Sequence, residues 1–216
     1  MHPYLIELAS LMAVFSFAIV APGADTAMVM RQAVLHGRRA AILTSFGIGT
    51  SLLFHVSYTI LGLGLIISKS ILLFNVIKWA GVAYLVYIGI QSLRAGPTVI
   101  SVDSGEGAGE RTKRAPQGAG KAFLLGFLAN ALNPKPVFFF LSIFSTLISH
   151  ETPALIKAGY GLVMASCLIA WFVGVSYFLT VPRMRAGFER AGKWINRASG
   201  AIFIGFGLKL AAEKAG

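Results

Sequence analysis

The chain has 216 residues, 56% of them hydrophobic, and a mean hydropathy of +0.74, well above the average for soluble globular domains. This composition excludes an ordinary soluble domain and indicates a membrane protein. The formal net charge is +11, but the basic residues lie between apolar runs, so lipid headgroups suit them better than nucleic acid does.

Six apolar runs with few charges predict six membrane-spanning helices. Most of them reach the ~20 residues that a helix needs to cross a bilayer. The runs are residues 5–20 (continuing to 33 across a break), 41–67, 71–93, 122–148, 154–181 and 198–212. We therefore expect an all-α, multi-pass membrane protein, with membrane lipids as its surroundings and almost no soluble mass.

The first run resembles a signal peptide, but we interpret it as a retained helix. Glu7 lies where a signal peptide has Lys or Arg, and no clear cleavage site of small residues follows. The run is interrupted at residues 20–26, VAPGADT, where Pro22 and Gly23 predict a break and Asp25 follows directly.

Two residues within the later runs, a histidine and a cysteine, have side chains that can ionise or react. His55, in LLFHVSY, is a candidate proton relay, and a hydrogen-bonded structural histidine is the alternative. Cys167 is the one cysteine of the chain, so it forms no disulfide within the chain, and we interpret it as a small apolar filler.

Residues 95–121 are rich in Gly, Lys, Arg and Glu without apolar periodicity, which predicts a flexible cytoplasmic linker. The linker divides the chain into two parts, residues 1–94 and 122–216. Most of the 19 basic residues flank alternate runs on one side. The positive-inside rule then puts the linker in the cytoplasm and both termini outside it.

The fourth run is interrupted at residues 130–140, NALNPKPVFFF. Asn133 can cap a new helix, with Pro134 at its first position. Pro136 costs little there, because the first N–H groups of a helix have no internal partner. Lys135 has no such explanation, because a cation near the hydrocarbon centre needs an anion.

The two parts of the chain share features in the same order, which predicts a repeat. Each begins with a proline-broken helix, and each third run is rich in glycine, at residues 80–95 and 199–212. Because each repeat has three spans, the second enters from the opposite face and is inverted. Inverted repeats with matching breaks are typical of transporters whose site lies between the breaks, although two unrelated proline kinks are the alternative.

Polar residues at the breaks predict the site. Asp25 is the acidic residue at a break; it either stabilises the first turn of a helix or binds substrate or a proton. Asn133 and Lys135 suit a carboxylate and Asp25 suits an ammonium group, so a small amino acid fits both. Asn130 either lines this site or bonds a neighbouring helix.

The motifs at the two breaks carry a family resemblance. The segment APGADTAMVMRQAVLHGRRAAILTSFGIGTSLLFH resembles the N-terminal signature of the LysE/RhtB family of amino-acid exporters. GFLANALNPKPVFFF is similar to its second signature, and GVAYLVYIGIQSLRA to its third-helix segment. The residues that match the family pattern are Pro22, Gly23, Asp25, Asn130, Asn133, Pro134 and Lys135. Ala24 and Pro136 depart from it.

The resemblance implies export of small amino acids or related metabolites across the bacterial inner membrane, by proton antiport with alternating access. A passive channel, or an exporter of another small solute, is the alternative. An intramembrane enzyme is disfavoured, because the histidines at positions 2, 36, 55 and 150 are not clustered. We therefore predict no catalytic residue, metal or cofactor; a homo-oligomer is compatible with the sequence.

Overall fold

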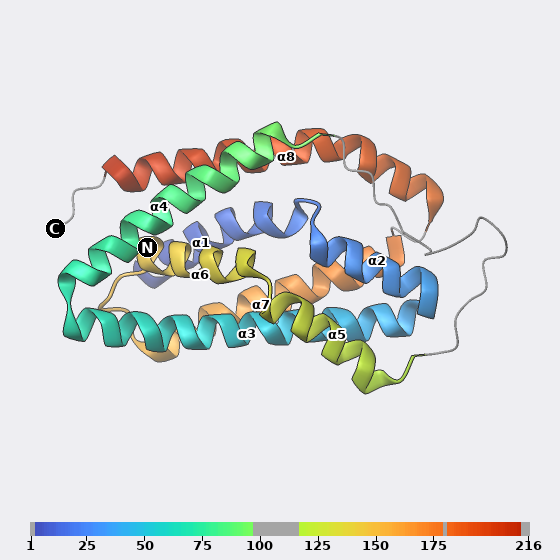
Figure 1. The fold of residues 1–216 in the computed structure, drawn as a ribbon, viewed down its shortest axis with the longest axis horizontal. Coiled ribbons are helices and arrows are strands. Elements are labelled where there is room, and N and C mark those ends of the chain that lie inside the picture. The colour runs from blue at the N-terminus through green and yellow to red at the C-terminus, as the bar shows by residue number, and fades with distance from the viewer. Residues whose placement is uncertain (1–2, 97–116, 179–180, 213–216) are drawn as a thin grey trace.

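The computed structural model describes residues 3–96, 117–178 and 181–212, and every regular element in these ranges is a helix (Figure 1). The helices are α1 (Pro3–Val20), α2 (Ala24–His36), α3 (Arg38–Lys69), α4 (Ile71–Arg94), α5 (Ala119–Ala131), α6 (Pro134–Leu147), α7 (Ala154–Phe178) and α8 (Pro182–Ala212). The prediction of an all-α protein is confirmed for the described part of the chain.

Four of these helices are long and apolar enough to cross a membrane: α1, α4, α7 and most of α3. The pair α5 and α6, bent by 60° at its break, passes the same test as one span. The predicted sixth span, residues 198–212, is the last part of α8, which is not among these candidates. Its apolar stretch is shorter than a bilayer requires. The membrane character is therefore supported, whereas the count of six spans is not confirmed.

The helices pack as two groups (Figure 1). We call α2, α3, α5 and α7 the α3 group, and α1, α4, α6 and α8 the α4 group. Helices pack extensively within each group and less extensively between the groups. Each broken helix therefore gives one half to each group, and both breaks lie where the groups meet.

Glycines allow the closest helix contacts within the groups. A Cβ atom at Gly47 of α3 would overlap the carbonyl oxygen of Phe123 in α5, and one at Gly126 of α5 would overlap that of Thr44. In the α4 group, a Cβ at Gly200 of α8 would lie 2.6 Å from the carbonyl oxygen of Gly89 in α4. Small residues at such positions bring membrane helices into backbone contact. The two glycine-rich runs noticed in the sequence thus pack against each other.

The predicted linker and orientation are only partly covered by the described residues. α4 ends at Arg94 and α5 begins at Ala119, while most of residues 95–121 lie outside the described residues. α1 begins and α8 ends toward the end of the molecule where α3 meets α4 (Figure 1). The division at residues 94 and 122, and the membrane face on which each end lies, stay predictions.

Candidate functional site

The first break separates α1 from α2. Gly23 occupies the position before α2 in an extended conformation, and no side chain caps the helix. Asp25 lies in the first turn of α2, where its charge suits the positive end of the helix dipole. Since it does not cap the helix, its carboxylate is available to other partners. Pro22 and Gly23 both lie in the break.

The second break separates α5 from α6. The side-chain oxygen of Asn133 accepts a hydrogen bond from the backbone N–H of Lys135 at 3.0 Å, which is the N-cap arrangement. Pro134 is the first residue of α6, and Pro136 falls in the same first turn, where no helical hydrogen bond is lost. The Tyr84 hydroxyl donates to the carbonyl oxygen of Lys135 at 3.1 Å. The sequence therefore specifies this helix start locally.

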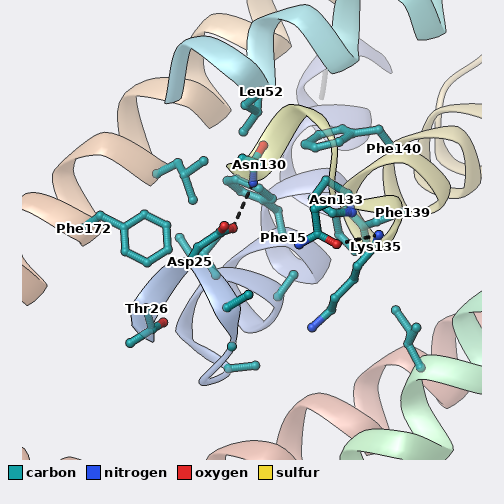
Figure 2. Close-up of a pocket in the computed structure, with 18 of the residues that line it drawn as sticks. Phe15, Asp25, Thr26, Leu52, Asn130, Asn133, Lys135, Phe139, Phe140 and Phe172 are labelled. Atoms are coloured by element: carbon teal, nitrogen blue, oxygen red, sulfur yellow. Dashed lines mark hydrogen bonds between the residues drawn. The ribbon is translucent and has the colours of Figure 1, made fainter. Parts of the chain in front are cut away.

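A hydrogen bond joins the two breaks. The side-chain amide of Asn130, in the last turn of α5, donates to a carboxylate oxygen of Asp25 at 2.9 Å (Figure 2). Asn130 is only 4% exposed, and its side-chain oxygen is buried without a hydrogen-bond partner. A buried acceptor of this kind costs about 1–3 kcal/mol until a donor reaches it.

His55 supports Asn130 from α3. Its Nε2 lies 3.2 Å from the carbonyl oxygen of Asn130 and its Nδ1 lies 2.7 Å from the Tyr58 hydroxyl. Because a carbonyl can only accept, Nε2 donates to it and Nδ1 can accept from Tyr58. His55 is fully buried and stacks on Phe140 at 5.8 Å between ring centroids. It lies behind Asn130 rather than on the cavity wall, a position that suits a structural role.

A cavity of about 250 Å³ lies at the breaks, between the two groups (Figure 2). It is lined by residues of all eight described helices and of both breaks: Phe15, Ala18, Ile19, Ala21, Gly23, Ala24, Asp25, Thr26, Leu52, Ile88, Asn130, Asn133, Lys135, Pro136, Phe139, Phe140, Leu168, Phe172 and Phe203. The structure thus brings Asp25, Asn130, Asn133 and Lys135 to one cavity. Pro22 and Pro134 are not among the lining residues.

The cavity offers two opposite charges that do not neutralise each other by contact. Asp25 and Lys135 are within Coulombic range. Within the described part of the chain, however, no ion pair or hydrogen bond reaches the Lys135 ammonium group. Figure 2 draws no interaction between the Lys135 ammonium group and the Asp25 carboxylate. Each charge is therefore available to a ligand.

Sequence reasoning missed the apolar walls of the cavity. Phenylalanines from four helices line it, at positions 15, 139, 140, 172 and 203. The chain has 16 phenylalanines, mostly in apolar runs that face either lipid or protein. No local signal in the sequence separates the cavity-lining ones from the rest, because they converge only through tertiary packing.

A second polar cluster ties α1 to α7 and to the connection before it. One carboxylate oxygen of Glu7 accepts from the backbone N–H of Ser149 and from the Thr152 hydroxyl, both at 2.9 Å. The other accepts from the Tyr160 hydroxyl at 3.0 Å. Glu7 belongs to the α4 group and Tyr160 to the α3 group. The cluster therefore joins the two groups at the end of the molecule where α1 begins.

Among the described residues, no group of three His, Cys, Asp or Glu side chains is arranged to hold a metal ion. Cys167, in α7, is half-buried and forms no disulfide. The polar groups that face the cavity are carboxylate, amide and ammonium groups together with Thr26. Such a set suits a small charged or zwitterionic ligand.

Comparison with known proteins gives a family match and curated relatives. The model of the family described as LysE type translocator matches residues 16–214. The threonine efflux protein of Escherichia coli strain K12 is 33% identical over 193 residues, covering 89% of this chain and 91% of that protein. The threonine efflux protein of Salmonella typhi is 32% identical with the same coverage. No solved structure matches the chain.

A further relative has a different named substrate. The homoserine/homoserine lactone efflux protein of Salmonella typhimurium is 28% identical over 198 residues, covering 90% of this chain and 91% of that protein. The matches extend through both helix breaks and almost the full length of the described chain. The range matched by the family model contains every lining residue of the cavity except Phe15.

Proposed function

Because the chain belongs to the LysE type translocator family, we propose that it is a membrane transporter that exports small amino acids. The names of its relatives, which are efflux proteins for threonine and for homoserine and its lactone, support this proposal. The observation that carries it is the pair of opposite charges, Asp25 and Lys135, that face one cavity without forming an ion pair.

An amino acid would satisfy both charges. Its ammonium group would bind the Asp25 carboxylate and the unpartnered side-chain oxygen of Asn130. Its carboxylate would bind Lys135, whose cation otherwise meets the positive end of the α6 dipole. The ligand would thereby supply the hydrogen bonds and the counter-charges that both breaks lack.

Proton antiport would provide the driving force, with Asp25 as the exchanging group. Acidic residues within membrane spans are typical proton carriers. A neutral amino acid that leaves in exchange for one proton draws on the membrane potential, worth about 2.3 kcal/mol per 100 mV, and on the pH difference. His55, behind Asn130, would hold the backbone carbonyl of Asn130 in place rather than relay the proton.

Alternating access would occur between the α3 and α4 groups. Each broken helix contributes one half to each group, so a shift between the groups would change the angle at both breaks. The packing of α3 on α7 and of α4 on α8 pairs the corresponding helices of the proposed inverted repeat. The moving bodies would therefore each combine helices from residues 1–94 and 122–216.

The Glu7 cluster would close the extracytoplasmic side. It joins α1 of one group to α7 of the other, and the positive-inside rule assigns this end to the outside of a bacterial inner membrane.

Cysteines introduced at positions 2 and 104, in a Cys167→Ala background, test this orientation. An impermeant maleimide should label position 2 from outside and position 104 only from inside; the opposite pattern would reverse the topology.

Transport by purified protein in proteoliposomes tests the proposal. A carrier gives counterflow of labelled amino acid, and in cells a protonophore should stop uphill efflux. A linear conductance without counterflow would favour a passive channel. Movement of another metabolite in place of any amino acid would favour an exporter of a different solute, and product formation would indicate an enzyme.

A further inference from the structure

The walls of the cavity are largely aromatic. Phe15, Phe139, Phe140, Phe172 and Phe203 line it, and each of them is 5% exposed or less. They come from α1, α6, α7 and α8, so aromatic rings bound the cavity from both helix groups. Figure 2 shows Phe172 beside Asp25, and Phe139 and Phe140 on the side of Lys135.

The polar lining residues are concentrated at the breaks. Asp25, Asn130 and Lys135 are the residues that the proposed function uses for the amino and carboxyl groups of a substrate, and Asn133 caps α6. Among the described lining residues, Thr26 is the single one with a hydroxyl group. A substrate side chain that carries its own hydroxyl would therefore find few hydrogen-bond partners and would lose its hydration.

The size of the cavity exceeds what a small hydroxylated amino acid fills. An apolar cavity of about 150 Å³ is enough to hold benzene. The cavity here is about 250 Å³, which leaves room for a benzene-sized group and an amino-acid head group together. A smaller side chain would leave a void beside the aromatic rings and forfeit their dispersion contacts.

We propose that the transported amino acid has an apolar side chain between leucine and phenylalanine in size, seated against these phenylalanines. The inference rests on the proposed function, amino-acid export, and moves the substrate from the small amino acids proposed there to larger apolar ones, which differ from the threonine and homoserine in the names of the relatives. An apolar pocket of matching size favours one substrate over another that differs by a single methylene group by roughly ten- to two-hundredfold. We expect a preference of this order for the apolar amino acids.

Competition in proteoliposomes tests the preference. Counterflow of labelled leucine is measured against unlabelled leucine, methionine, phenylalanine, threonine, homoserine and lysine. The apolar amino acids should inhibit at concentrations at least tenfold lower than threonine and homoserine. Equal or stronger inhibition by threonine or homoserine would overturn the inference while leaving amino-acid export intact. If no amino acid in the panel exchanges, with any of them used as label, the proposed function fails and this inference fails with it.

A matched pair of variants locates the side-chain subsite. Ala18 lines the cavity from α1, whereas Ala13 is exposed on the same helix. Ala18→Leu should narrow the cavity and weaken the inhibition of counterflow by phenylalanine at least tenfold. Inhibition by alanine, which has a smaller side chain, should weaken less. Ala13→Leu adds the same atoms on the outside of the helix and should leave both unchanged. Unaltered inhibition by phenylalanine in well-folded Ala18→Leu protein would show that the side chain lies elsewhere and would overturn the inference.

Discussion

Both helix breaks contain a proline and a charged residue, but different hydrogen bonds stabilise them. At the second break, Asn133 caps α6 within the same chain segment, with Pro134 at the first helical position. At the first break, no side chain caps α2, and Asp25 is held by Asn130 of another helix. The second break is specified locally, whereas the first depends on how α2 and α5 are packed.

This difference assigns different tasks to the two charges. The backbone around Lys135 is fixed by Asn133 and by Tyr84, so the ammonium group extends from a defined base. The Asp25 carboxylate is held by the side-chain amide of Asn130, and the backbone carbonyl of Asn130 is bonded in turn by His55. A change in the contact between α2 and α5 would therefore move the acidic side of the cavity first.

The largest expected effect is that of Asp25→Asn. The amide keeps the size of the side chain and can still bond Asn130, but it removes the charge that binds the ammonium group and carries the proton. Transport of labelled amino acid in proteoliposomes should fall at least a hundredfold. Glu151→Gln, in an exposed loop, loses the same charge and should transport normally. Normal transport by Asp25→Asn would reduce Asp25 to a structural role.

Lys135→Ala should come next. Its charge would bind the substrate carboxylate, so the apparent affinity should fall tenfold or more, which corresponds to about 1.4 kcal/mol. The backbone N–H of residue 135 still reaches Asn133, so α6 should remain capped. Lys69→Ala, an exposed lysine at the end of α3, is the matched control. Unchanged affinity in a variant with normal membrane levels would exclude a role in binding.

Asn130→Ala and Asn133→Ala test the two breaks against each other. Asn133→Ala removes a cap and should lower stability by about 1 kcal/mol while affecting affinity modestly. Asn130→Ala removes the partner of Asp25 and should weaken substrate binding more than it lowers stability. Thermal unfolding and counterflow, measured on both variants, separate these outcomes. If the two asparagines gave the same pattern, the breaks would be equivalent, contrary to their geometry.

The local features of the site could be predicted from the sequence. Asn133, Pro134 and Pro136 form a helix start in any setting, because a cap and two prolines act through neighbouring backbone groups. The pairing of Asp25 with Lys135 as the charges of one site followed from the scarcity of acidic residues at the breaks. The structure brings both to one cavity.

The features that depend on packing could not be predicted. The α3 group and the α4 group each combine helices from both expected halves of the chain. The contacts that hold these groups together, such as those of Gly47 with α5 and of Gly89 with α8, join residues far apart in sequence and could not be predicted from it. The bond between Asn130 and Asp25 joins residues far apart in sequence. The count of six spans rested partly on short apolar runs such as residues 198–212, and it is not confirmed.

The smallest expected effects come from two hydroxyl groups, one behind each break. Tyr84 donates to the carbonyl oxygen of Lys135, and Tyr58 bonds His55, which holds the carbonyl of Asn130. Both tyrosines are half-buried, so Tyr84→Phe and Tyr58→Phe should each cost about 0.5–1.5 kcal/mol of stability. Tyr84→Phe should change transport less than twofold, because Asn133 still fixes its break. Tyr58→Phe should weaken substrate affinity several-fold, because the support of Asn130, and through it of Asp25, is loosened. The reverse order in proteoliposome assays would mean that the second break, rather than the first, is the adjustable one.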